Sequence, residues 1–264
     1  MKKQSFKIAK VILLGSLLSF SATPLLSNAG EERRAPPETR SAGTLSDTVI
    51  RSITKISEAL SPEDGGEPDL VTAKEELDEL YERRYERMNN FEKSTTLNFY
   101  TNYYMTTENF PEAIRIFEQI LTLEELRADV RDRALKSLGQ LTQIEERWQD
   151  SIRYLELWRD QSEEEEDSVF KSLASAHFQV EEFSDSLVHW LNHMNFQADA
   201  GEQLVEQDYR FLQGLYFTLE DYQNALEVTK TIIMLYDQPQ DWRNLSAIYA
   251  TLDNDENRVR ALNI

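Results

Sequence analysis

The chain has no cysteine, little glycine and proline, and too few basic residues to balance its acidic ones. Its 264 residues include 8 Gly and 7 Pro, with 28 basic residues against 48 acidic ones and a formal net charge of -20. The absence of cysteine excludes disulfides, thiolate metal sites and cysteine nucleophiles. Scarce glycine and proline disfavour the many tight turns of an all-β fold. The acidic balance argues against nucleic acid as a partner, because binding to it depends on neutralising phosphates.

The N-terminus has the three-part form of a secretory signal. Four lysines and no acid occupy residues 1–10, an apolar run follows over 11–20, and small residues precede a cleavage point after Ala29. The apolar run is about half of the roughly 20 residues that a membrane-spanning helix needs. We therefore predict a signal peptide over 1–29, with no direct membrane insertion after cleavage and a periplasmic location. An uncleaved anchor and an ordinary buried helix are the alternatives.

Three further segments precede the main part of the chain. Residues 30–44 are polar and contain Pro36-Pro37, which predicts a disordered linker. Apolar residues at helical spacing predict a short amphipathic helix over 45–61. A stretch rich in Glu, Arg and Leu predicts one long leading helix over 66–93.

From Ser94 onward the sequence repeats. The tetratricopeptide-repeat (TPR) pattern is W-x2-L-G-x2-Y followed by A-x3-F over about 34 residues. Residues 242–249 fit its first half, with Ser in place of Gly, and 113–117 fit its second half. Aligning the rest predicts five units over 94–264, with starts near Ser94, Asp132, Asp167, Glu206 and Pro239. The fold prediction is an all-α solenoid of stacked TPR helix pairs. Because the chain stops inside the fifth unit, we expect a truncated array.

Several stretches resemble one bacterial family. The sequence RMNNFE at 87–92, LNFY at 97–100, FPEAI at 110–114 and DWRNLSAIY at 241–249 are similar to the periplasmic TPR proteins associated with TonB, ExbB and ExbD components of gammaproteobacteria. The resemblance covers roughly residues 66–264. It implies an accessory role in an energy-transducing transport system and partners of the TonB, ExbB or ExbD type. A scaffold for cell-wall or outer-membrane assembly is the alternative, because the same solenoid would serve it.

No catalytic chemistry is predicted. The chain has no G-x-S-x-G motif and no phosphate-cradling glycine loop, so we expect no enzyme, catalytic residue or cofactor. His189 and His193 have the i, i+4 spacing of zinc proteases, but Trp190 stands where their general base would be. We therefore interpret both as structural histidines and predict no metal. A metal-dependent hydrolase is a remote alternative.

The expected partner is a protein or peptide that binds along the first helices of the units. Their fifth positions are mostly basic although the chain is acidic, and a basic row of this kind would form charge-assisted hydrogen bonds with a carboxylate-bearing peptide. Two phenylalanines at a neighbouring position would add apolar contact. The predicted binding groove comprises Asn98, Arg133, Lys136, Lys171, Phe178, Arg210, Phe217 and Arg243. The alternative is that these are solvated side chains paired with local acids.

Overall fold

The computed structural model describes residues 43–63, 65–162 and 165–262. Within these ranges the chain is helical and has no strand. The predicted signal peptide and most of the predicted linker lie outside the described residues. The helices are α1 (Asp47–Leu60), α2 (Leu70–Arg84), α3 (Asn90–Thr106), α4 (Phe110–Leu121), α5 (Ala128–Ile144), α6 (Trp148–Gln161), α7 (Asp167–Gln179), α8 (Phe183–Asp199), α9 (Glu206–Thr218), α10 (Tyr222–Tyr236), α11 (Pro239–Thr251) and α12 (Asp255–Leu262), with a 3-10 turn, η2, at Tyr85–Arg87.

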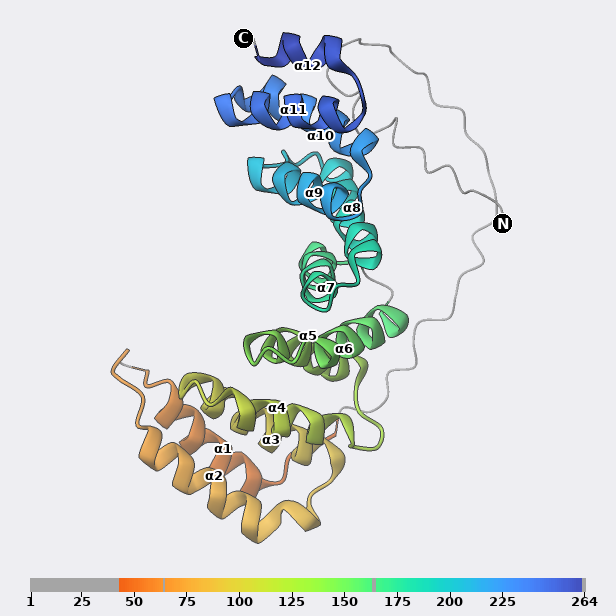
Figure 1. Cartoon of the computed structure of the whole chain (residues 1–264). Helices are drawn as coiled ribbons and strands as arrows, with labels where there is room; N and C mark the ends of the chain where they lie inside the picture. The colour runs from red at the N-terminus through yellow and green to blue at the C-terminus, as the bar shows by residue number, and fades with distance from the viewer. Residues whose placement is uncertain (1–42, 64, 163–164, 263–264) are drawn as a thin grey trace, which may run out of the picture. The chain divides into compact units, whose positions relative to one another are not determined.

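Consecutive helices pack against each other from α1 to α12 (Figure 1). They pair as α1 with α2, α3 with α4, and so on to α11 with α12. The short amphipathic helix at the start is thus the first member of a helix pair, and Val49 and Ile56 bury its apolar side. None of the described helices is both long and apolar enough to cross a membrane.

The prediction of one long leading helix over 66–93 is wrong. The helix ends at Arg84, and a new helix, α3, begins at Asn90. The cause is a capping box: the Asn89 side chain accepts a hydrogen bond from the Glu92 N–H, and the Glu92 carboxylate accepts one from the Asn89 N–H. Glu92 also accepts the N–H of Ser46, which ties the start of α1 to the start of α3.

The turn inside each later helix pair has the same conformation. Its middle residue is acidic and has a positive φ between 52° and 63°, and the next N–H bonds back to the carbonyl five residues earlier at 2.7 to 2.9 Å. This is the Schellman arrangement that ends a helix in the left-handed region. The turn residues are Glu108, Glu146, Glu181, Glu220 and Asp253. Their intervals of 38, 35, 39 and 33 residues equal those between the predicted unit starts.

Small residues allow the two helices of a unit to approach closely. A Cβ added to Gly139 would lie 2.4 Å from Leu155 of the paired helix, so no larger residue fits there without movement. Ser151 and Ser186 are fully buried, and each hydroxyl donates to a carbonyl of the paired helix. Gln213 occupies the glycine position of its unit and is bulky for it. Its amide donates to Thr229 at 2.6 Å, which accounts for its burial.

The buried apolar residues form two clusters that meet within α7. The first extends from Val49 to Leu173 and the second from Ala174 to Ala261. Stacking each pair on the next buries faces that no pair could bury alone. The boundary between the clusters is where α7 packs between α6 on one side and its own partner α8 on the other.

Candidate functional site

The predicted groove residues lie on the first helices of the units. Asn98 is on α3, Lys136 on α5, Lys171 on α7, Arg210 on α9 and Arg243 on α11, each at the corresponding position of its helix. Arg133 lies on α5 one turn before Lys136. The stacking of the units therefore places these side chains along one row of helices.

Two of these cations already have carboxylate partners in the following unit. Lys136 contacts Glu166, at the start of α7, at 2.5 Å, and both side chains are about one-third exposed. Arg210 binds Asp241, in the first turn of α11, at 2.9 and 3.2 Å, and Asp241 is fully buried. Both acids lie at a helix N-terminus, where the backbone N–H groups favour negative charge. These two cations hold neighbouring units together, a role that sequence reasoning did not assign to them.

The other basic side chains are more available. Lys171 and Arg243 are exposed and have no carboxylate partner among the described residues. Arg243 makes only a long contact of 3.4 Å to Gln240. Arg133 is exposed and lies 4.0 Å from Asp129, an interaction of small energy at the surface. The positive charge free to meet a ligand is thus concentrated on α7 and α11.

The two predicted phenylalanines pack against the second core cluster. Phe178 contacts the rings of Phe183 and Phe211, and Phe217 contacts that of Tyr222. Both are partly buried members of the second cluster. Their main contacts are therefore with the core, beside the row of basic side chains.

A row of short side chains runs beside the basic row on the later units. Ser175 of α7, Gly214 of α9 and Ala247 of α11 each lie four residues after the basic position of their helix. A Cβ added to Gly214 would meet nothing within 4 Å, so the surface is open there. This row was missed by sequence reasoning, because small residues at these positions match no motif. It leaves room for an extended main chain beside Lys171 and Arg243.

The structure separates the two histidines whose spacing resembles a zinc motif. His193 is buried between two acids: Nδ1 contacts Asp167, and Nε2 lies 3.3 Å from Asp208. His189 instead stacks on His177, with ring centroids 5.2 Å apart. The hydrolase alternative, which depended on His189 and His193 acting together, therefore loses its ligand pair.

Comparisons with known proteins give the fold and no family. No protein-family model matches the chain, and the comparison with curated proteins found no match. Among solved structures, a tetratricopeptide repeat protein from Parabacteroides merdae superposes with a TM-score of 0.53 at 10% identity, covering 83% of this chain and 78% of that chain. The MamA protein gives 0.49 at 16% identity, covering 64% and 88%, and BtubC from P. vanneervenii gives 0.46 at 17% identity, covering 83% and 89%. The first likeness confirms the predicted fold: the chain is an all-α TPR protein.

Proposed function

We propose that this TPR protein is a non-catalytic scaffold that binds an acidic, extended peptide segment of a partner protein. One observation carries the proposal: Lys171 and Arg243 remain without carboxylate partners in a chain that has 20 more acids than bases. Solvent-exposed cations beside an open, short-side-chain row suit a peptide whose carboxylates gain charge-assisted hydrogen bonds. Concave repeat surfaces are used in this way because the units extend along the ligand.

The finer proposal is a periplasmic accessory component of a TonB-dependent energy-transducing transport system. Its support is the resemblance at residues 87–92, 97–100 and 241–249, together with the signal-like N-terminus. Partners would then be TonB-, ExbB- or ExbD-type proteins. A scaffold for cell-wall or outer-membrane assembly is the competing proposal, since it needs the same fold and differs only in its partner.

Charge reversal at the two free cations tests the binding surface. The full chain and a Lys171→Glu/Arg243→Glu variant are compared for binding to purified periplasmic segments of TonB and ExbD at low and moderate salt. We expect the variant to lose at least about tenfold in affinity and wild-type binding to weaken with salt.

A matched control separates a local effect from a change in net charge. Lys230→Glu/Arg83→Glu makes the same change in charge at exposed, salt-bridged positions on second helices, and it should bind like wild type. Equal losses in both double variants would reject the surface. Binding of outer-membrane assembly proteins in place of TonB or ExbD would favour the competing scaffold role.

The predicted location has its own test. The full-length chain with a C-terminal tag is expressed in a Gram-negative host, fractionated, and sequenced from its N-terminus. We expect a periplasmic product that begins near residue 30. A cytoplasmic product that retains residues 1–29 would reject the exported role without affecting the fold.

A further inference from the structure

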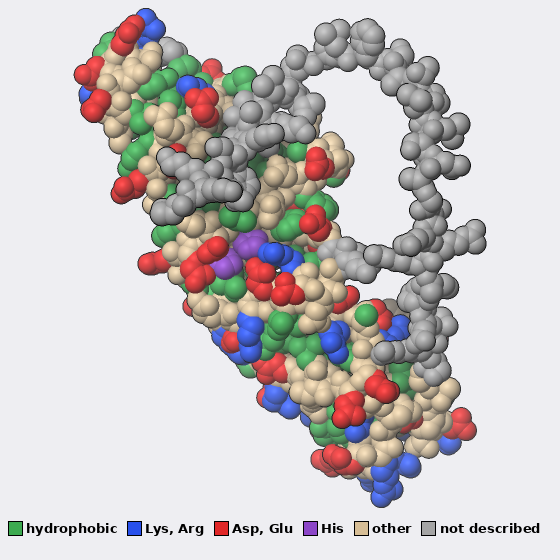
Figure 2. Space-filling view, turned by 90° about the vertical axis from the view of Figure 1, so that its right-hand side faces the viewer, with side chains coloured by type: hydrophobic (Ala, Val, Ile, Leu, Met, Phe, Trp, Pro, Cys, Tyr) green, Lys and Arg blue, Asp and Glu red, His purple; other side chains and the backbone are tan. Residues whose placement is uncertain are grey.

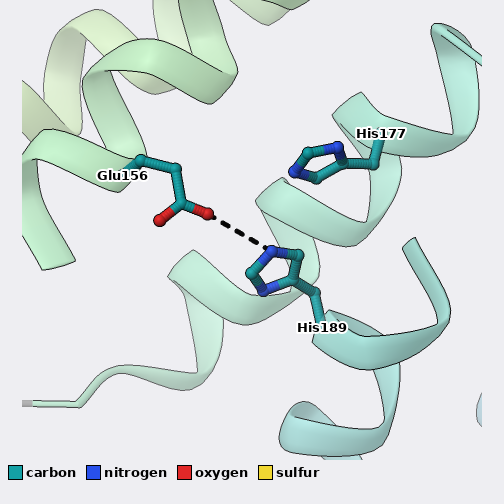
Figure 3. Close-up of side chains that lie close together, drawn as sticks. All are labelled: Glu156, His177 and His189. Carbon is teal, nitrogen blue, oxygen red and sulfur yellow. Dashed lines mark ion pairs between the residues drawn. The ribbon is translucent and has the colours of Figure 1, made fainter. Parts of the chain in front are cut away.

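Three side chains from three helices point toward one another on the seam between α6 and the α7–α8 pair. They are Glu156 of α6, His177 of α7 and His189 of α8 (Figure 3). One ligand atom from each lies within 4.8 Å of the others. Both histidines are buried, and Glu156 is about one-third exposed. On the face drawn in Figure 2, histidine side chains are visible at the surface with acidic side chains beside them.

We propose that Glu156, His177 and His189 bind a divalent zinc-type metal ion. Two imidazole nitrogens and one carboxylate oxygen are a ligand set that zinc prefers, with a fourth position left for water or a further ligand. The proposed site is independent of the peptide-binding row, because none of its residues belongs to that row.

The strongest support is an unpaired nitrogen. His177 Nε2 is buried and has no hydrogen-bond partner among the described residues. A buried polar atom left unpaired costs free energy, so such atoms call for a ligand, water or ion. In Figure 3 this ring faces Glu156 and His189. A metal ion would supply the missing partner.

The opposite nitrogen of the same ring is already oriented for metal binding. His177 Nδ1 lies 2.7 Å from the Glu182 carboxylate. A proton on Nδ1 donates to Glu182 and leaves the Nε2 lone pair free. Metal-binding histidines generally hold their other N–H to a carboxylate in this manner, which sets the tautomer and the ring orientation.

The spacing of the other two ligands already suits zinc. His189 Nε2 and the nearer Glu156 oxygen are 3.4 Å apart. A tetrahedral ion with bonds of about 2.0–2.1 Å holds its ligand atoms about 3.3–3.4 Å apart. Since all three ligand atoms lie within 4.8 Å of one another, small side-chain rotations would complete the set.

Some charged groups around the site favour a bound cation and others oppose it. Burial, followed by Arg159 and His177, lowers the pKa of His189 to about 4, so its ring is neutral at pH 7 as a ligand must be. Asp185 favours a bound cation. Arg159 opposes it: its guanidinium lies 3.1 Å from Glu156 and 3.5 Å from His189 Nδ1. The Arg159 side chain is 37% exposed and can turn outward when the ion binds.

The decisive measurement is zinc binding by the full chain. Equilibrium dialysis with Zn²⁺ alone gives the stoichiometry and isothermal titration calorimetry gives the affinity, while Co²⁺ absorption in the visible range reports a four-coordinate site. We expect one ion per chain. Glu156→Gln should weaken binding more than about tenfold and Glu182→Gln about tenfold, whereas Arg159→Gln should tighten it about fivefold by removing a repelling charge.

Controls distinguish a built site from general attraction to an acidic protein. Glu79→Gln removes one salt-bridged glutamate on α2, far along the chain, and should leave zinc affinity unchanged. Glu156 and Glu182 are at the surface, so their variants should fold, as checked by circular dichroism. The proposal is overturned if wild type binds no zinc, or if Glu156→Gln and Glu79→Gln bind it equally.

Discussion

Two successive seams of the array each bury a tryptophan and at least one histidine, and the hydrogen-bond partners of these side chains differ between the seams. At the seam of α8 with α9, the Trp190 N–H donates to the Asp208 carbonyl at 2.9 Å, and both nitrogens of His193 contact acids. At the seam of α6 with α7, Trp158 Nε1 and His177 Nε2 have no partner among the described residues. Polar groups that satisfy one another define a structure, whereas unpaired ones indicate where something else can bind.

The largest effect is expected from removing the histidine of the satisfied seam. His193→Ala leaves Asp208, which is 6% exposed, without a side-chain partner and creates a cavity between α7, α8 and α9. We expect the free energy of unfolding to fall by about 3 kcal/mol. Urea denaturation followed by far-ultraviolet circular dichroism measures it, with exposed Val188→Ala on the same helix as the control. A loss below about 1 kcal/mol would contradict this account of the seam.

Matched tryptophan variants compare the seams directly. Trp190→Phe removes a donor that Asp208 uses, and Trp158→Phe removes an N–H that is already unpaired. The volume change is the same, so the difference between the variants reports the hydrogen bond. We expect Trp190→Phe to cost about 1–2 kcal/mol more than Trp158→Phe in urea denaturation. Equal losses in the two variants would contradict the difference in hydrogen bonding between the two indole N–H groups.

Acid should destabilise the seam of α6 with the α7–α8 pair, because it protonates the buried His189. Burial lowers the pKa of His189 from its ordinary 6.5 to about 4, so the folded state favours the neutral ring. This contribution to stability is complete above pH 6.5 and is lost as the pH falls toward 4. Between pH 7 and 5 we expect wild type to lose about 2 kcal/mol more than His189→Gln in urea denaturation. Parallel pH profiles would contradict the lowered pKa.

The smallest effect is expected from an ion pair between units. Lys136 and Glu166 are each about one-third exposed, so Lys136→Gln should lower the free energy of unfolding by less than about 1 kcal/mol. Asp241→Asn, at the fully buried partner of Arg210, should cost more by the same measurement. A larger loss at Lys136 would mean that its position over the Trp158 ring, 5.3 Å from the centroid, is the stronger interaction.

The repeat pattern predicted the fold, because its residue types report packing inside one unit. Gly139, Ser151 and Ser186 lie where close helix approach requires small side chains, and the TPR fold is confirmed. The helix break near Met88 was missed, since it depends on side-chain capping at Asn89 within a segment of strong helix formers.

The candidate sites were less predictable, because they depend on contacts between units. The fifth-position cations were identified, but no pattern in the sequence shows that Arg210 reaches Asp241, 31 residues away, while Lys171 reaches no acid. His177 occupies a position where the TPR pattern has tyrosine, so the repeat pattern alone gives no reason to consider it a ligand. Packing within its own helix pair brings it beside His189, and stacking on the preceding unit brings Glu156 to both. The prediction of no metal came from the spacing of His189 and His193, and that spacing carries no information about the cluster of Glu156, His177 and His189.

The turn within each pair has a consequence for engineering the chain. From α3 to α12, every such turn is three residues long, whereas the connections between pairs vary from two residues at 237–238 to six at 122–127 and 200–205. The Schellman bond constrains every loop of the first kind, whereas among the described connections between pairs it is present at 200–205, from the Glu202 N–H to the Gln197 carbonyl, and absent at 122–127. Tags, fluorophore sites or inserted domains should therefore be placed at 122–127, between helix pairs, where a change in length leaves the helix register intact.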